Sequence, residues 1–250
     1  MDLGLLAICF ALFIVAMLYA SVGHGGASGY LAVLSLSAYG TMEARWLKQH
    51  AWCLNLIVAA IAFWHFHRSG HHLPKLTIPF VVASAPLAMF AGSLKVGGSV
   101  YDLLLSICLI LAAYRLYTVR SDVSLRDMPH WRVAAPTGGV IGFASGVVGI
   151  GGGVLLSPIL LLKGWATPKN AAATAALFVW VNSLASLGGV ILSNQLVLDI
   201  GVLIPFVIAV LIGGFLGSRY GAEIAPQQMV RKLLVIVLVA AATRRIVELF

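Results

Sequence analysis

The chain has 250 residues, of which 61% are hydrophobic and only 10% are charged, and its mean hydropathy is +1.01. Soluble globular proteins carry roughly 25% charged residues, so this composition excludes a water-exposed globular fold. The net charge of +8 is not expected to reflect nucleic-acid binding, because the 16 Lys and Arg residues lie mainly between apolar runs, where they orient a membrane protein. We therefore expect an all-α integral membrane protein without a soluble domain.

Ten apolar segments follow one another along the chain, over residues 3–20, 27–39, 44–66, 76–94, 100–119, 133–148, 154–162, 168–192, 196–216 and 229–247. A membrane-spanning helix needs about 20 apolar residues, so most of these segments are predicted to cross the bilayer. The segments 27–39 and 154–162 are shorter, and each follows a glycine-rich stretch. This pattern indicates a broken helix or a re-entrant hairpin at both places.

The two halves of the chain carry the same landmarks in the same order. The stretch 23–26 (Gly-His-Gly-Gly) recurs at 149–152 as Gly-Ile-Gly-Gly, and Ile-Pro-Phe at 78–80 recurs at 204–206, both 126 residues later. A third similarity links the Ala-Ala-Tyr-Arg that starts at residue 112 with the Ala-Ala-Thr-Arg that starts at residue 241. The sequence thus predicts two repeats of about five apolar segments each, which is the plan of many secondary transporters.

The repeats are predicted to cover residues 1–120 and 133–250, with residues 121–132 as a cytoplasmic connection within one structural unit. Each repeat crosses the membrane an odd number of times, whether or not its glycine hairpin spans it. The repeats must then be inverted relative to each other. Connections on one side carry eleven basic residues and those on the other side carry five, which places the first side in the cytoplasm and both termini outside the cell membrane.

The glycine-rich stretches are the candidate binding site. Four glycines lie within five residues of the second half, and a helix that begins directly after them would present free N–H groups and the positive end of its dipole. Such a helix N-terminus binds anions. Inversion would bring the two turns together from opposite membrane faces. The alternative is that these glycines only permit tight helix packing. The glycines concerned are Gly23, Gly25, Gly26, Gly149, Gly151, Gly152 and Gly153.

The second glycine motif, followed by Pro158 and echoed in the first half, resembles the sulfite exporter TauE/SafE family of membrane permeases. The resemblance covers essentially the whole chain. It implies a carrier in the cytoplasmic membrane for small sulfur-containing anions such as sulfite, sulfoacetate, thiosulfate or organosulfonates. The first half departs from the motif, because Ala27 stands where a third adjacent glycine would be and Ala32 replaces the proline.

Several polar residues are predicted to lie deep in the helices around these turns. Asn55 and Asn182 each fall about 18–20 Å along their helices, near the membrane middle, where an amide can donate to a substrate oxygen or to another helix. Lys48, next to Gln49, could supply a countercharge to an anion, or its side chain could extend to the membrane interface. Hydroxyl residues are weaker candidates, because hydroxyls often bond their own helix carbonyls. They are Ser21, Ser28, Ser145, Ser157 and Thr174.

The titratable residues set limits on the chemistry. His24 lies inside the first glycine turn, where it could link anion binding to a proton. Four histidines around Arg68 raise a metal hypothesis, but their spacing fits no closed zinc motif, and no metal or cofactor is expected. All eight Asp and Glu residues fall at segment ends or in connections, which suits an anion carrier because a carboxylate would repel the substrate. The four histidines are His65, His67, His71 and His72.

Two further rows of glycines recur at every fourth residue, and small residues at this spacing let helices pack closely in lipid. They are expected to serve contacts within one chain or between the chains of a homodimer. The rows are Gly138, Gly142 and Gly146, and Gly213, Gly217 and Gly221.

The sequence as a whole favours a non-enzymatic secondary carrier, an exporter of small sulfur oxyanions. The alternatives are a passive anion channel and a membrane-embedded metal enzyme.

Overall fold

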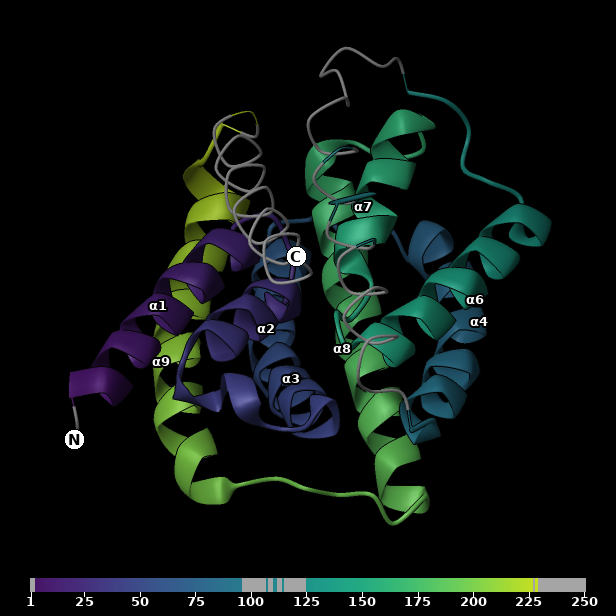
Figure 1. The fold of residues 1–250 in the computed structure, drawn as a ribbon. Helices are drawn as coiled ribbons and strands as arrows, with labels where there is room; N and C mark the ends of the chain where they lie inside the picture. Colours follow the sequence, from purple (N-terminus) through teal and green to yellow (C-terminus); the bar gives the residue numbers. More distant parts are fainter. Residues whose placement is uncertain are drawn as a thin grey trace.

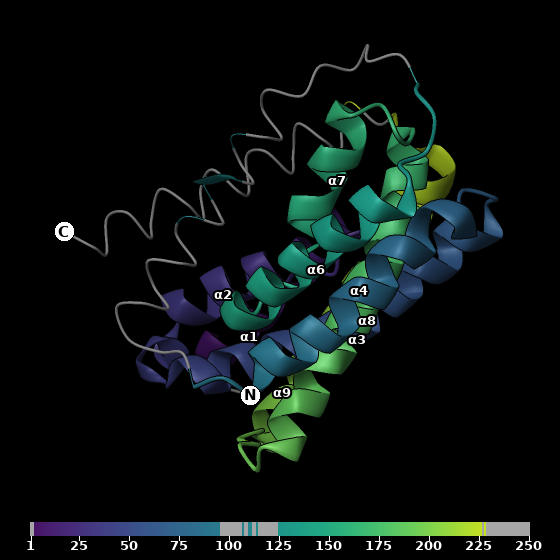
Figure 2. The ribbon, with the colours of Figure 1, turned by 90° about the vertical axis from the view of Figure 1, so that its right-hand side faces the viewer.

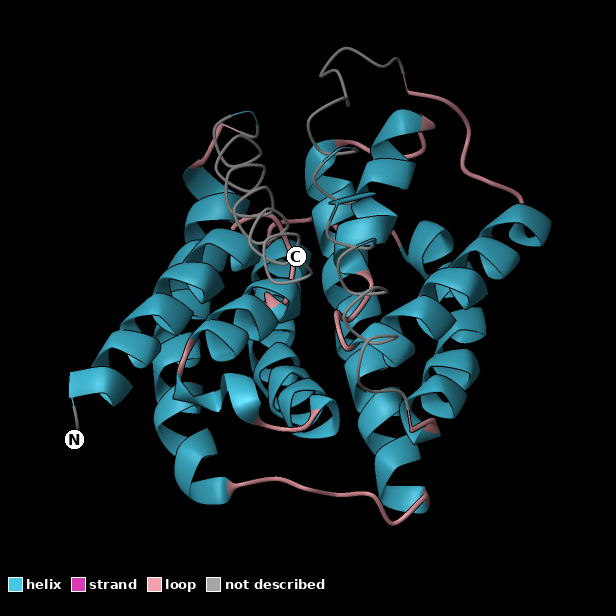
Figure 3. Ribbon diagram, in the orientation of Figure 1, coloured by secondary structure: helices cyan, strands magenta, loops and turns pink. Residues whose placement is uncertain are grey.

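The computed structural model describes residues 3–95, 125–226 and 228, together with residues 107, 110, 111 and 114. The described residues form helices joined by short loops, and no strand occurs among them (Figure 3). The predicted all-α membrane fold is confirmed. The predicted segment 229–247, and all but four isolated residues of 100–119, lie outside the described residues.

The helices follow the predicted order in both halves. The first half contains α1 (Leu3–Ala20), α2 (Ala27–Leu36), the 3-10 turn η1 (Ala38–Thr41), α3 (Ala44–Arg68) and α4 (Pro74–Ser93). The second contains α6 (Trp131–Val148), α7 (Gly153–Leu162), α8 (Pro168–Leu192), α9 (Ile200–Arg219) and the π-helical turn η2 (Tyr220–Ile224). The four α-helices described in each half have the same lengths in the same order, which are 18, 10, 25 and 20 residues.

Helix length and hydropathy separate the spanning helices from the short ones. Within the described part of the chain, α1, α4, α8 and α9 with η2 are long and apolar enough to cross a membrane. Helix α3 has 25 residues but carries Arg45, Lys48 and Arg68. Helices α2 and α7 are about 15 Å long at 1.5 Å per residue, half of a hydrocarbon core of roughly 30 Å. Neither can span the bilayer alone, as the sequence predicts.

The two rows of spaced glycines join helices of opposite halves. Helix α6 packs along α4 and α9 packs along α1, with α3 and α8 between these pairs (Figures 1 and 2). A Cβ atom added to any of these glycines would collide with the neighbouring helix, mostly with its backbone. The predicted packing role is confirmed, and both rows act within the chain. Gly138, Gly142 and Gly146 face Phe80, Ser84 and Ala88, and Gly213, Gly217 and Gly221 face Phe13, Met17 and Ser21.

Corresponding helices of the two halves point in opposite directions. Gln49 at the start of α3 donates to the carbonyl of Gln195 just after α8, and Asn170 at the start of α8 donates to the carbonyl of His71 just after α3. Helices α3 and α8 are therefore antiparallel. Helix α1 ends near Ala172 at the start of α8, and α6 ends near Lys48 at the start of α3, so α1 and α6 point in opposite directions. Because α6 runs parallel to α4 and α9 runs parallel to α1, α4 and α9 are opposed as well. These are the directions that an inverted repeat requires, while the common origin of the halves stays a prediction.

The short helices begin at the middle of the long ones. The Ala27 N–H donates to Asn55 Oδ1 at 2.9 Å, so α2 starts against the twelfth residue of α3. The chain then returns to the start of α3, where the rings of Tyr39 and Trp46 stack with centroids 5.3 Å apart. Helix α7 likewise begins at Gly153, which packs against Val179, the twelfth residue of α8. Both short helices thus have their N-termini inside the bundle.

Candidate functional site

Each glycine turn uses backbone conformations that favour glycine. Gly26 precedes α2 with a φ of 102°, and Gly152 precedes α7 with a φ of 81°. Side chains with a Cβ rarely adopt these left-handed angles, so the sequence requires glycine at these positions. Both turns are buried.

The two turns meet at one pair of side chains. A Cβ at Gly25 would lie 2.8 Å from Val179 Cγ1 and would also clash with Asn55. A Cβ at Gly151 would lie 2.6 Å from Asn55 Nδ2 and 3.0 Å from the same methyl of Val179. The N-terminal ends of α2 and α7 therefore converge between α3 and α8, which is the arrangement expected from the sequence.

His24 ties the first turn to α7. Its Nε2 lies 3.0 Å from both the Gly153 carbonyl oxygen and Ser157 Oγ. Because a carbonyl only accepts, Nε2 carries the hydrogen, and Nδ1 is left as an acceptor. The ring is 2% exposed, and Nδ1 has no hydrogen-bond partner in the described structure.

The two predicted asparagines have different surroundings. Asn55 accepts from the Ala27 N–H and donates to Ser183 Oγ at 3.3 Å, so it lies at the meeting point of the turns. Asn182 is also fully buried, but neither its Oδ1 nor its Nδ2 has a partner among the described residues. The residue at the position equivalent to Asn55 is Val179, three residues before Asn182 in α8.

The predicted hydroxyl residues divide between the site and the scaffold. Ser21 donates to the Leu18 carbonyl in its own helix, and Ser28 donates to the Tyr19 hydroxyl at 2.9 Å. Thr174 pairs with Thr77 at 3.0 Å and joins α8 to α4. Ser157 contacts His24, as described above. Ser145 is fully buried with an unpartnered Oγ, and its Cβ lies 3.3 Å from the position of a Cβ at Gly152.

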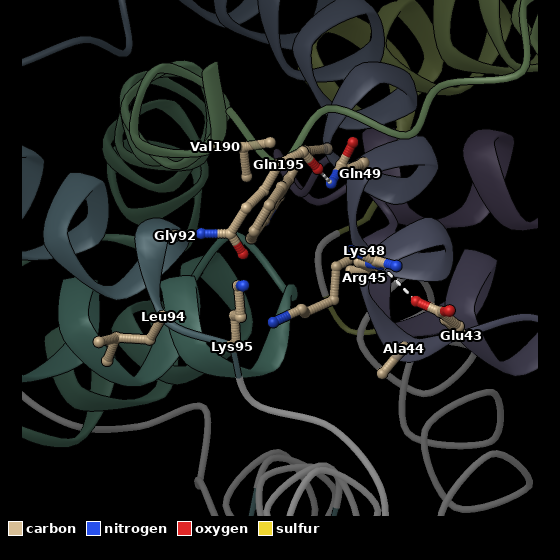
Figure 4. Close-up of a pocket in the computed structure, with 11 residues that line it drawn as sticks. Glu43, Ala44, Arg45, Lys48, Gln49, Gly92, Leu94, Lys95, Val190 and Gln195 are labelled. Atoms are coloured by element: carbon tan, nitrogen blue, oxygen red, sulfur yellow. Dashed lines mark hydrogen bonds and ion pairs between the residues drawn. The ribbon is translucent and has the colours of Figure 1, made fainter. Parts of the chain in front are cut away.

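A basic pocket lies at the end of the bundle where α3 begins and where α4 and α8 end. Its volume is about 350 Å³, and Lys48 and Lys95 extend into the same space (Figure 4). Among the described residues that line it, Glu43 is the only carboxylate, and it forms an ion pair with Arg45. The pocket therefore favours anions. It is lined by Glu43, Ala44, Arg45, Lys48, Gln49, Trp52, Gly92, Leu94, Lys95, Val190 and Gln195.

Lys48 connects this pocket to the second glycine turn. Its side chain is only 3% exposed, and its Nζ donates to the Val147 carbonyl at 3.3 Å, near the negative C-terminal end of α6. The Nζ also lies 5.9 Å from the centre of the Trp52 ring. A Cβ at Gly149 would lie 2.7 Å from Lys48 Cγ. The stem of Lys48 thus separates the pocket from the turn.

Gln49 forms one wall of the pocket and holds the α8–α9 connection. Its Nε2 donates to the Gln195 carbonyl at 2.8 Å, and its Oε1 accepts from the Val197 N–H at 2.7 Å. The predicted pair Lys48 and Gln49 therefore lines the pocket, while none of the predicted glycines of the two turns is among its described lining residues.

Sequence reasoning missed Trp52, Lys95, Gln195 and Val179. Trp52 follows Lys48 by four residues, so the sequence could have placed both side chains on the same face of the helix. Lys95 and Gln195 could have been found from the predicted inversion, because it places the start of α3 beside the end of α8. Val179 gave no signal, since an apolar residue in an apolar helix is typical of packing alone.

The histidine connection has no metal-binding arrangement. His67 Nδ1 lies 3.3 Å from His72 Nδ1, while Ser218 Oγ lies 2.8 Å from His65 Nδ1. No group of three His, Cys, Asp or Glu side chains that could hold a metal occurs in the described ranges. Burial, followed by the positive charge of Lys169, lowers the pKa of His71, which favours its neutral form.

Comparison with known proteins agrees with this architecture. A family model described as "Sulfite exporter TauE/SafE" matches residues 8–245. The chain is also 32% identical over 250 residues to "Probable membrane transporter protein y4hK" of Sinorhizobium fredii (strain NBRC 101917 / NGR234), covering 98% of this chain and 99% of the relative. No solved structure matches the chain. With its apolar helices and full-length match, the chain belongs to the sulfite exporter TauE/SafE family of membrane transporters.

Proposed function

We propose that this transporter is a secondary carrier that exports small sulfur-containing oxyanions, such as sulfite, thiosulfate, sulfoacetate or organosulfonates. The anion would be bound near the two glycine turns and exposed alternately to the two sides of the cell membrane by movement of the inverted halves. Binding and release need no covalent chemistry, so the protein acts without enzymatic turnover, metal or cofactor.

One observation carries this proposal: Lys48 lines a positively charged pocket and packs against Gly149 of the second glycine turn, while the N-termini of α2 and α7 converge farther along α3 at Asn55. Pocket cations attract an oxyanion, and helix N-termini bind it through backbone N–H groups. Asn55 and the nearby hydroxyls supply further donors. The family match supports a sulfur oxyanion as the substrate class.

The proposal is tested with proteoliposomes loaded with sulfite or an alkylsulfonate. The wild type is expected to release the anion, and Gly152→Leu is expected to abolish release, because a side chain there fills the second turn and collides with Phe178. Gly70→Leu is the matched control. Gly70 has a similar φ of 77° but nothing within 4 Å of its Cβ position.

Size-exclusion chromatography verifies that both variants fold. If folded Gly152→Leu releases the anion as fast as Gly70→Leu, the second turn has no role in transport. If the wild type releases none of the anions, the proposed substrate class is wrong.

A further inference from the structure

The two glycine turns differ in how far the protein itself fills them. Comparison of the halves position by position shows three differences. Tyr19 and Tyr30 of the first half correspond to Ser145 and Leu156, each 126 residues later, and Asn55 corresponds to Val179 as the twelfth residue of its helix. Every one of these changes replaces a large or polar group of the first half by a smaller or apolar one.

The first turn is occupied by side chains of the protein. Asn55 accepts from the first N–H of α2, that of Ala27. Tyr30 donates to the Gly25 carbonyl at 2.7 Å, and its ring lies against Gly26. The Tyr19 hydroxyl accepts from Ser28 at 2.9 Å. Three side chains around the start of α2 are thus hydrogen-bonded to the turn or to the helix, those of Tyr19, Tyr30 and Asn55, while His24 Nδ1 has no partner among the described residues.

The second turn lacks these partners. Among the described residues, the N–H groups of Gly25, Gly26 and Ser28 have no acceptor, nor do those of their counterparts Gly151, Gly152 and Val154. The turns differ at the first residue of the short helix, because the Ala27 N–H donates to Asn55 while the Gly153 N–H has no acceptor. Val179 lies against Gly153, where a residue like Asn55 would provide an oxygen. Ser145, which faces Gly152, is fully buried with an unpartnered hydroxyl. Buried polar groups nearly always have a hydrogen-bond partner, so this turn requires an external acceptor.

We propose that the transported anion is held at the N-terminal turn of α7 alone, and that the turn of α2 is its structural counterpart, filled by Tyr19, Tyr30 and Asn55. The ligand is a small oxyanion, which accepts hydrogen bonds from the turn and from Ser145. The positive end of the α7 dipole attracts it. Lys48, which packs on Gly149, lies between this proposed anion site and the basic pocket. This inference rests on the proposed function and narrows its site to one half.

Two deletions of a single oxygen at corresponding positions test the proposal. Ser145→Ala removes the unpartnered hydroxyl of the second turn, and Tyr19→Phe removes the hydroxyl at the same place in the first. Binding of sulfite, thiosulfate and sulfoacetate to the purified full chain is measured by calorimetry. We expect Ser145→Ala to raise the dissociation constant roughly tenfold, as for a lost hydrogen bond to a charged group, and Tyr19→Phe to leave it within about twofold.

A second variant tests the same turn by adding a hydrogen-bond acceptor that belongs to the protein. Val179→Asn supplies an oxygen beside Gly153 and would compete with the anion, which also raises the dissociation constant roughly tenfold. Val58→Asn is the control, because Val58 is equally buried in α3 but faces Gly214 of α9. A thermal melt establishes that each variant is folded.

The outcomes separate the two proposals. A wild type that binds none of the three anions contradicts the proposed function. A wild type that binds, with unchanged affinity in Ser145→Ala and Val179→Asn, overturns only the assignment to α7. Equal weakening by Tyr19→Phe and Ser145→Ala would also overturn it, because both turns would then contribute.

Discussion

Lys48 shows how one side chain can link two parts of a binding site. A buried ammonium group is costly unless its charge is compensated. Here it lies at the C-terminal end of α6 and near the face of the Trp52 ring. Both contacts stabilise the cation. A neutral residue at this position keeps the packing but loses the charge.

We expect Lys48→Gln to raise the concentration of anion needed for half-maximal transport at least tenfold, as for a lost interaction with a charged group. Lys75→Gln, at the exposed start of α4, should have no effect. Transport rates across a series of sulfite concentrations check this. Similar kinetics in the two variants would remove Lys48 from the site.

His24 is the residue at which a proton can accompany the anion. An imidazolium ion is unfavourable at this buried position unless a negative charge lies beside it. A proton would then bind together with the anion, so anion affinity would rise as the pH falls from about 8 to 5.

Measurements use an alkylsulfonate, whose own charge is constant over that range. We expect His24→Gln, which retains a hydrogen-bond donor, to flatten the pH dependence. A profile identical to that of the wild type would exclude His24 as the coupling residue.

At the scale of helices, glycine spacing determines which pairs pack closely. Helix α6 approaches α4, and α9 approaches α1, at distances that exclude even a methyl group. In lipid this contact is stabilised by van der Waals packing, because burial from lipid provides no hydrophobic gain. The same helix pairs hold the two halves together, so a substitution that weakens their packing is expected to destabilise the whole fold.

Gly142→Ala tests this packing. Its added methyl would lie 2.6 Å from the Ser84 carbonyl oxygen, while a methyl at Gly188 would have only Met89 Cε at 4.0 Å. Overpacking costs about 1–3 kcal/mol, so Gly142→Ala should unfold at lower temperature than the wild type. Gly188→Ala should equal or slightly exceed the wild type, since Ala favours a helix interior by up to about 1 kcal/mol. Thermal unfolding followed by tryptophan fluorescence compares the three, and equal melting temperatures would contradict the packing role.

At the scale of the whole molecule, the antiparallel course of α3 and α8 places the starts of these two helices at opposite ends of the bundle. One end holds the basic pocket. At the other end, Gly23 packs directly on the backbone of Ala172, which leaves no room for a side chain.

A carrier and a channel with this architecture differ in one measurable property. For the carrier we expect counterflow: uptake of labelled sulfite should be accelerated when unlabelled sulfite is present inside the vesicles, because the loaded site returns faster than the empty one. Liposomes without protein provide the background. Uptake that is indifferent to internal sulfite would favour a passive anion channel.

The sequence by itself determined where the helices lie along the chain, because apolar runs and the glycine-rich stretches between them are local features. The expected ranges 3–20 and 168–192 agree with α1 and α8 residue for residue. It also predicted that the two glycine turns would meet, because the spacing of the repeats and the odd number of membrane crossings in each repeat can both be read from the sequence. Motif resemblance identified the family.

Only the tertiary structure decided which side chains surround the turns. Asn55 and Asn182 looked equivalent in sequence, yet a difference of three residues along α8 turns the helix by most of one revolution and leaves Val179 facing the glycines. The basic pocket is assembled from three helix ends that are far apart in the chain. Contacts of this kind depend on helix rotation and register, which hydropathy does not encode, and they make the second turn different from the first.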